Sequence, residues 1–452
     1  MKAIRVLAFV LAAAVGARSQ TEDPYAAVAA LLPAQHAEQQ AGRRPMTVEE
    51  LEAAAQAANP ELRVAARRVA VLEARQPAAG TLDDPWFLYR GWGVPLERPW
   101  DLNRAQNMFM VGRTLPGPGK RELRSQVATH EVEVARAELE AVRRDVAAQV
   151  RKAFYELLLN SDQLRLHDEQ VALARQAIES ARIKYVVGRV PQQDVLKAQI
   201  ALTRLVDHLV MLELDGSLAR VRLNALMGRD PEASLEVAGS YASPAELPSL
   251  AELQRSALER RPELVAARAA VHRDETVRKL AEKAYSPDYN LSAGYMLQPS
   301  GSPFRNAYMA ELSINLPWLN RRKHDAEIAG AQAGLNLQQA EYEGRRIAVF
   351  REIQEALVRA RSAEKLVRLY RDTLRPQARA VLQATAAAYE TDRTDFLNLL
   401  DGQNTAIDVE VSYFRALAEF EARIADLERA VGAPLPRATS ARAANTQPEV
   451  SQ

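Results

Sequence analysis

The sequence predicts a mainly α-helical protein that also carries a transmembrane β-barrel, with the whole architecture laid out twice along the chain. Three observations predict this class: landmarks that recur in both halves, long proline-free segments with a seven-residue apolar repeat, and short segments in which apolar and polar residues alternate. A hydrophobic content of 48% with only 6% aromatic residues is typical of long packed helices.

The duplication is visible in landmarks that return in the same order at a nearly constant offset. The segment Asn59–Leu62 returns as Arg261–Leu264. Further matched pairs are Leu115 with Leu316, Ala137 with Ala340, Tyr185 with Tyr389, Arg189 with Arg393, Leu196 with Leu400, Gln199 with Gln403 and Gly228 with Gly432. We therefore expect two repeats, 46–240 and 241–436, neither of which buries its apolar faces alone.

The two ends of the chain differ from the repeats in composition. Lys2 and Arg5 precede the apolar run Val6–Val15, and small residues follow, which predicts a signal peptide over 1–19 cleaved after Ala17 or Ser19. The run is too short for a membrane-spanning helix, and a buried N-terminal helix is the alternative. Residues 20–45 are predicted to form a linking segment, and residues 437–452 a polar, disordered tail.

A strand pair is predicted before each long helical segment, over about 85–116 and 287–317. In Tyr289–Leu297 and Tyr308–Leu316, apolar residues alternate with small or polar ones, and a Pro/Ser/Gly turn separates the two segments. Such alternation predicts a β-hairpin with one apolar and one polar face. The segments 86–94 and 106–115 alternate less clearly and are predicted to be strands mainly because the repeat requires them.

Each repeat then contains a long helical hairpin, over about 120–228 and 320–432. Neither proline nor glycine occurs between Lys120 and Val187. We expect tight turns at 187–190 and 391–394, helix ends at Gly228 and Gly432, and a bend or break at Pro376. A seven-residue repeat of apolar residues predicts helices that supercoil against neighbours. The repeating positions are Val132, Leu139, Val146 and Ala153 in the first half and Ile328, Leu335, Tyr342, Val349 and Ala356 in the second.

The tryptophans gather around the predicted strands. Aromatic residues at strand ends that flank an apolar outer face form the interfacial girdle of a transmembrane barrel. Arg321 and Arg322, which follow the second strand pair, are suited to phospholipid headgroups because long cationic side chains reach the membrane interface. A soluble core and solvated charges are the alternatives. The four tryptophans are Trp86, Trp92, Trp100 and Trp318.

Two strands in each repeat make four strands per chain, which is too few to close a barrel. An open sheet edge is not tolerated in lipid, so several chains must pool their strands. Three chains would supply twelve strands. The sequence requires this pooling but does not set the number of chains.

Composition argues against several classes of function. A net charge of +1 makes nucleic acid an unexpected partner, and the absence of cysteine removes disulfides, thiolate metal sites and lipidation of an N-terminal cysteine. The six histidines show no metal-ligand spacing, and no phosphate loop or nucleophile motif is present. We therefore expect no enzymatic activity and no cofactor.

Taken together, these features resemble the TolC-type outer membrane efflux proteins over about Thr47–Pro434. The resemblance rests on the signal peptide, the duplicated unit, the Asn-Pro-Glu-Leu helix, the Leu-Pro after the last strand and the Tyr-x-x-Gly-Arg tip with its following Asp-Val-Leu-x-Ala-Gln. It implies a homotrimer with a twelve-stranded barrel in the outer membrane of a Gram-negative bacterium and a helical barrel in the periplasm. Such a protein is the exit duct of a tripartite efflux or type I secretion system.

The resemblance also implies partners and site residues. The partners would be a periplasmic adaptor protein and an inner-membrane transporter, for which the resistance-nodulation-division type is one candidate. Leu115–Lys120 resembles members paired with heavy-metal pumps. Adaptor contacts map to Gly188, Arg189, Asp392 and Arg393. The channel constriction maps to Asn398 and Asp401, with Asp194 and Asp395 as further candidates.

In a trimer, Asp401 would form a ring of three carboxylates and favour cations. The alternative is a set of solvated helix-start carboxylates that the helix dipole stabilises. For the whole chain, the alternative function is that of a periplasmic adaptor or a structural coiled-coil protein. Such an adaptor is expected to have one hairpin, whereas this sequence predicts two, each with its own strand pair.

Overall fold

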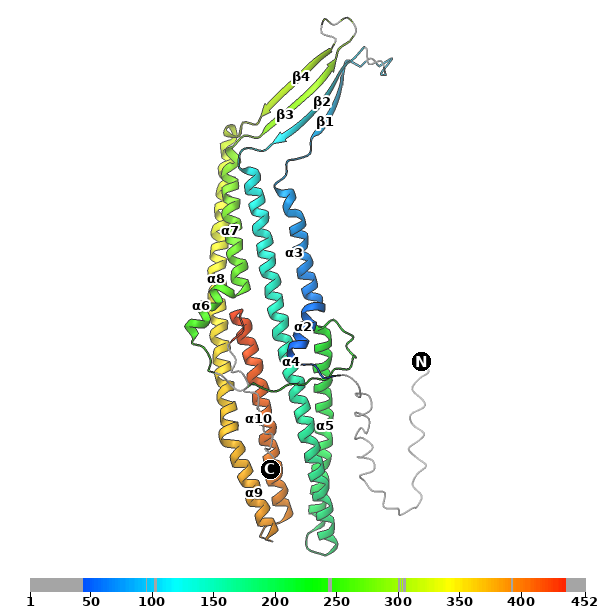
Figure 1. The fold of residues 1–452 in the computed structure, drawn as a ribbon, viewed down its shortest axis with the longest axis vertical. Coiled ribbons are helices and arrows are strands. Elements are labelled where there is room, and N and C mark those ends of the chain that lie inside the picture. The colour runs from blue at the N-terminus through cyan, green and yellow to red at the C-terminus, as the bar shows by residue number, and fades with distance from the viewer. Residues whose placement is uncertain are drawn as a thin grey trace, which may run out of the picture. The chain divides into compact units, whose positions relative to one another are not determined.

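The protein consists of long helices and one antiparallel sheet (Figure 1). A computed structural model describes residues 44–94, 96–100, 104–242, 246–299, 301, 303, 306–391 and 393–435, so the predicted signal peptide and C-terminal tail lie outside the described residues. The first half contains α2 (Val48–Ala58), α3 (Pro60–Ala79), β1 (Trp86–Trp92), β2 (Gln106–Leu115), α4 (Lys120–Val186) and α5 (Gln192–Leu226). The second half contains α6 (Leu250–Arg260), α7 (Pro262–Glu282), η1 (Lys283–Tyr285), β3 (Tyr289–Leu297), β4 (Asn306–Ile314), η2 (Pro317–Asn320), α8 (Arg321–Leu369), η3 (Tyr370–Leu374), α9 (Arg375–Glu390) and α10 (Phe396–Val431).

The two sequence repeats do not coincide with the two compact units of the chain. One unit, here called the tip unit, comprises residues 160–218 and 375–411. The other, here called the sheet unit, comprises the described residues of 46–159, 219–374 and 412–435. Each unit therefore combines parts of both repeats, which fits repeats that do not bury their apolar faces alone.

The four predicted strands are confirmed and form a single sheet in the order β1-β2-β3-β4. The register pairs Leu115 with Tyr289 and Tyr289 with Ile314. Residues directly opposite one another share a face, and successive residues of a strand alternate between faces. The apolar face carries Phe87, Tyr89, Phe109, Val111, Leu291, Tyr295, Tyr308, Leu312 and Ile314. The polar face carries Arg90, Gln106, Asn290, Ser292, Glu311 and Ser313.

The junction between β2 and α4 is fixed by an ion pair with the second repeat. The Lys120 ammonium lies 2.8 Å from a carboxylate oxygen of Asp288, and the Gly117 N–H donates to the same oxygen at 2.7 Å. A Cβ at position 117 would lie 2.6 Å from the carbonyl oxygen of Pro287, so only glycine allows this approach. The Leu115–Lys120 segment therefore has a structural role at the base of the sheet.

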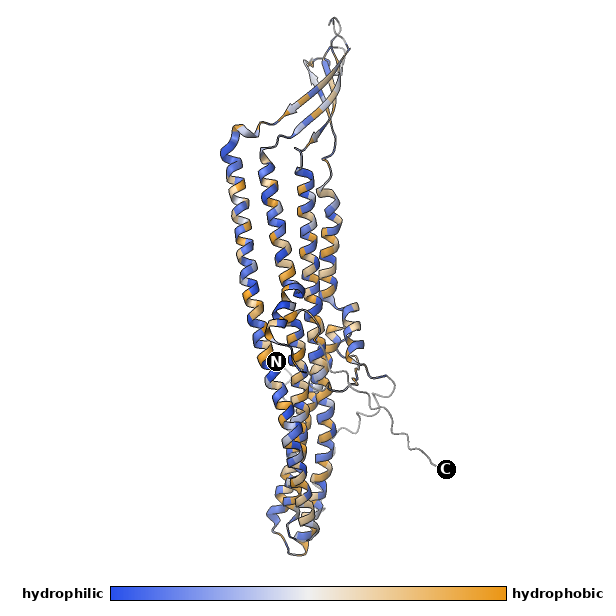
Figure 2. Ribbon diagram, turned by 60° about the vertical axis from the view of Figure 1, so that its left-hand side comes forward, coloured by the Kyte–Doolittle hydropathy of each residue, from blue (hydrophilic) through white to orange (hydrophobic). Residues whose placement is uncertain are grey.

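The seven-residue pattern corresponds to the buried side of the long helices. All nine repeating positions predicted from the sequence are buried or half-buried, and Val146 and Ala153 are fully buried. Figure 2 shows hydrophobic and hydrophilic residues intermixed along every helix. Among the described helices, none is long and apolar enough to cross a membrane.

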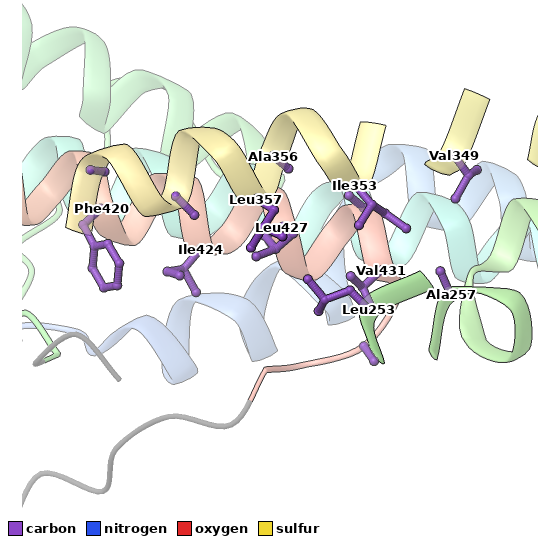
Figure 3. Close-up of a cluster of buried hydrophobic side chains, with 14 of the residues drawn as sticks. Leu253, Ala257, Val349, Ile353, Ala356, Leu357, Phe420, Ile424, Leu427 and Val431 are labelled. Carbon is purple, nitrogen blue, oxygen red and sulfur yellow. The ribbon is translucent and has the colours of Figure 1, made fainter. Parts of the chain in front are cut away.

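The core of the second repeat lies where α6, α8 and α10 meet in the sheet unit (Figure 3). Ile353 and Leu357 of α8 belong to one buried cluster with Leu427 and Val431 of α10, and Leu253 of α6 completes it. A second cluster gathers α2, α4 and α5 in the same way around the buried Phe154. The two repeats thus build equivalent cores.

The ends of the returning helices explain why several landmarks recur. Gly228 and Gly432 have φ values of 62° and 78°, and a Cβ at either position would lie 2.7 Å from a carbonyl oxygen at the end of α2 or α6. Both glycines end their helices as predicted. Asn59 donates from its amide to the Leu226 carbonyl at 2.9 Å, and Arg261 donates to the Arg429 carbonyl at 2.5 Å. The two side chains tie equivalent helix ends together with different chemistry.

The predicted interruption at Pro376 is also confirmed. Helix α8 ends at Leu369, and the π-helical turn η3 separates it from α9, which begins one residue before the proline. Proline has no N–H to donate, and a π-turn leaves room for its ring.

Candidate functional site

The first hairpin tip is a tight turn with an exposed apolar surface. Gly188 has a φ of 74°, and the Arg189 N–H donates to the Lys184 carbonyl at 2.9 Å, which closes α4 in a Schellman-type turn. Arg189 is exposed, as are Val186 and Val187. The sequence thus places a cation and two aliphatic side chains where a partner can reach them.

The second tip repeats this turn. The Arg393 N–H donates to the Ala388 carbonyl at 2.8 Å, in the same six-residue ring as in the first tip. Asp392, which takes the place of Gly188, lies outside the described residues. Within the tip unit, the Lys184 ammonium lies 5.7 Å from the centre of the Tyr389 ring, so a cation–π contact connects α4 to α9.

The carboxylates predicted at the constriction do not form a cluster in one chain. Asp395 caps α10, since its side chain accepts from the Asn398 N–H at 2.9 Å. Asn398 and Asp401 are both exposed and lie one helical turn apart on one face of α10. The neighbouring Gly402 faces α9, where an added Cβ would lie 2.6 Å from the Thr385 hydroxyl oxygen. Asp401, the residue before this buried glycine, is exposed.

Asp194 belongs to the equivalent first turn of α5. Its carboxylate lies 3.9 Å from the Lys197 ammonium, which is itself largely exposed. Asp194 lies in the first turn, where the helix dipole favours a negative charge. The chain brings Asp194 and Lys197 together as neighbours on one helix but supplies no contact between Asp194 and Asp401.

The residues predicted at the membrane interface fall on different sides of the sheet. Trp86 is paired with Gly112 and Trp92 with Gln106, so both project from the polar face rather than the apolar one. Trp318 lies in η2, directly before Arg321 and Arg322, and all three are exposed. Trp100 is exposed in the turn after β1. The aromatic residues on the apolar face are instead tyrosines and phenylalanines.

Sequence reasoning missed a pair of histidines in the tip unit. His167 of α4 is 2% exposed, neither of its ring nitrogens has a hydrogen-bond partner in the described residues, and its ring centre lies 5.8 Å from that of His208 on α5. Burial lowers the pKa of His167, and the charge of His208 lowers it further, against the opposing effect of Asp168. Helical spacing predicts the inward direction of His167, but not its partner on another helix. In the described part of the chain, no group of three or more His, Asp or Glu side chains could hold a metal ion.

Comparison with known proteins defines the class. The family model of the outer membrane efflux proteins matches residues 109–229 and 253–433. The chain therefore belongs to the outer membrane efflux protein family. Within that family it is similar to the cobalt-zinc-cadmium resistance protein CzcC of Cupriavidus metallidurans, with 25% identity over 70% of this chain and 74% of the relative.

Two solved structures share the fold. A structure of CusC matches with a TM-score of 0.70 and 17% identity, covering 85% of this chain and 92% of that one. The outer membrane protein VceC of Vibrio cholerae matches with a TM-score of 0.69 and 18% identity, covering 86% and 96%. The predicted TolC-type fold is thus confirmed, with four strands contributed by each chain.

Family membership settles the general function. The chain is an outer membrane efflux channel that extends into the periplasm and serves as an exit duct. The alternative of a periplasmic adaptor or coiled-coil protein is set aside, because each helical hairpin follows its own strand pair in the one sheet.

Proposed function

We propose that the chain acts as a homotrimer whose pooled strands form a twelve-stranded barrel. The observation that carries this proposal is the open sheet, in which β1 and β4 are the edges. Unpaired strand edges are not stable in lipid. Because the chain supplies an even number of antiparallel strands, β4 of one chain meets β1 of the next in antiparallel orientation, and the pattern closes without a mismatch.

Exposed apolar residues on the helices of the sheet unit support the same assembly. Val64 of α3 is 70% exposed, and Leu337 and Ile347 of α8 are also largely exposed. A single exposed apolar side chain needs no partner, but several exposed apolar side chains along one helix favour an interface. Side chains of this kind are therefore suited to burial against a neighbouring copy.

We further propose that the tips dock to a periplasmic adaptor and an inner-membrane transporter, with metal cations as the exported substrate class. The exposed Gly188, Arg189 and Arg393 support the docking, because their turns present backbone and guanidinium groups outward. The similarity to a cobalt-zinc-cadmium resistance protein supports the substrate class. A transporter of the resistance-nodulation-division type is proposed on the resemblance of Leu115–Lys120 to members paired with heavy-metal pumps.

Three measurements test these proposals. Native mass measurement of the detergent-extracted protein should give three copies. In a double variant with cysteine at both Phe87 and Leu312, the cysteine on β1 of one chain should cross-link to the cysteine on β4 of the next. The protein has no other cysteine to interfere. A detergent-free, soluble monomer would refute the assembly.

Deleting the gene from its host should increase sensitivity to cobalt, zinc and cadmium salts, and unchanged sensitivity would refute the substrate class.

A further inference from the structure

Half of the chain's eight methionines lie on one face of the sheet. The register places Met108 directly opposite Met296, and it places Met110 and Met309 opposite Gly294 from either side. Because opposite residues share a face, all four methionines project from the polar face, together with Glu311 and Ser313.

Gly294 lies at the centre of this group. A Cβ at position 294 would lie 2.8 Å from Cγ of Met110, so the Met110 side chain covers the glycine. On the other side of Gly294, Met309 of β4 lies directly opposite. Met296 follows two residues along β3 and therefore points the same way. Its sulfur accepts from the side-chain amide of Gln106. Four thioethers thus surround a position that has no side chain.

Packing explains only one of these methionines. Met110 is 3% exposed, whereas the other three are only half-buried. The inward face of a channel-forming barrel is expected to be polar, and methionine offers neither charge nor a strong hydrogen-bonding group. What it does offer is a polarisable thioether, which prefers soft cations such as Cu(I) over hard or borderline divalent ions.

We infer that this methionine face is a binding site for a soft monovalent cation, Cu(I) or Ag(I). The inference rests on the proposed function in one respect: the polar face must line the duct for the site to meet ions that pass through it. The four thioethers around Gly294 offer a cation more than one set of neighbouring sulfur ligands on one chain. Binding that is shared between neighbouring sites lets an ion enter and leave, as conduction requires.

The test uses the full-length protein in detergent, labelled with ¹³C in its methionine methyl groups, and Ag⁺ in chloride-free buffer. Addition of Ag⁺ should shift the methyl signals of Met108, Met110, Met296 and Met309 in a saturable way. The signals of Met46, Met211 and Met227 are the internal controls and should not move. Zn²⁺ and Co²⁺ should shift none of the four.

Variants separate binding from folding. The triple variant M110L/M296L/M309L should bind Ag⁺ about tenfold more weakly or worse, since each leucine removes a sulfur but keeps the volume. M211L, which changes an exposed methionine of α5, should bind as the unchanged protein does. No saturable shift, an equal shift at Met211, or full Ag⁺ affinity in the triple variant would each overturn the inference. Native mass measurement of the same samples shows separately whether the trimer has assembled.

Discussion

At the scale of single residues, the Lys120–Asp288 pair sets how the first long helix meets the sheet. Burial acts to raise the pKa of Asp288, but the Lys120 hydrogen bond, the Gly117 N–H and nearby positive charge outweigh it and hold that pKa below its usual value. The Lys120 side chain is only 9% exposed, so it depends on this partner for compensation of its charge.

Replacing Asp288 by Asn should lower the free energy of unfolding by about 1–3 kcal/mol, because it leaves a buried ammonium without its counter-charge. The contribution should be complete above about pH 4, the usual pKa of an unfolded aspartate, and should be lost as the pH falls through the lower folded pKa. Loss of helical circular dichroism on heating in detergent measures both effects. Asp84→Asn removes an exposed carboxylate just before β1 and should change little. Equal losses in the two variants would contradict the argument.

His167 makes a second prediction, in a milder acid range than that of Asp288. Its folded pKa is lowered by burial, so the unfolded state binds the proton more readily and the local stability of α4 against α5 should fall as the pH drops below about 6.5. Hydrogen exchange of residues 160–174, corrected for the intrinsic rate, should therefore accelerate at pH 5.5 relative to pH 7.5. His167→Leu should abolish the acceleration, whereas His272→Leu, at a half-exposed histidine paired with Glu275, should leave it in place.

At the scale of elements, β4 separates lipid-facing from duct-facing positions. Leu312 is 59% exposed on the apolar face, opposite Leu291, while Ser313 lies on the polar face opposite Asn290. Leu312→Arg should cost roughly 2–4 kcal/mol if the residue lies near the bilayer midplane, and Ser313→Arg far less. The yield of folded protein in outer membrane vesicles and its resistance to urea measure the difference. Equal tolerance at both positions would show that the apolar face does not contact lipid.

The elements themselves follow closely from the sequence, because their signals are periodic and local. The seven-residue repeat, the missing proline and glycine, and the two helix-ending glycines predict α4, α5 and α10 to within a residue or two of their bounds. The interruption at Pro376 was predicted from the same local chemistry, but its form as a π-turn was not.

Relations across elements do not follow from the sequence in this way. The strand register that turns Trp86 and Trp92 to the polar face depends on cross-strand partners that local alternation in β1 does not specify. Lys120 and Asp288, like His167 and His208, are joined only by the packing of helices and strands that are distant in sequence. The cap formed by Asp395 could have been predicted from the sequence, because aspartate is a common N-cap residue just before a helix.

At the scale of the whole molecule, the exposed face of α10 is where a trimer would gather its carboxylates. Three copies of Asp401 around one axis would repel one another, and Lys197 and Arg393 are candidate cations to offset that repulsion. Asp395 contributes less to such a ring because its carboxylate is engaged as a helix cap. Asn398, one turn away, adds polarity without charge.

Asp401→Ala should therefore reduce cation selectivity, and block by added cations, in planar bilayers without changing the yield of assembled protein, because it removes three charges from one ring. Asp426 is unsuitable as a control, since it pairs with Lys152 and Arg423 in the sheet unit. Asp207→Ala is better matched, because it removes an exposed carboxylate of α5 for which the described residues show no ion pair. If Asp401→Ala and Asp207→Ala leave selectivity and block equally unchanged, Asp401 is a solvated carboxylate, and the constriction must be sought at Asp194.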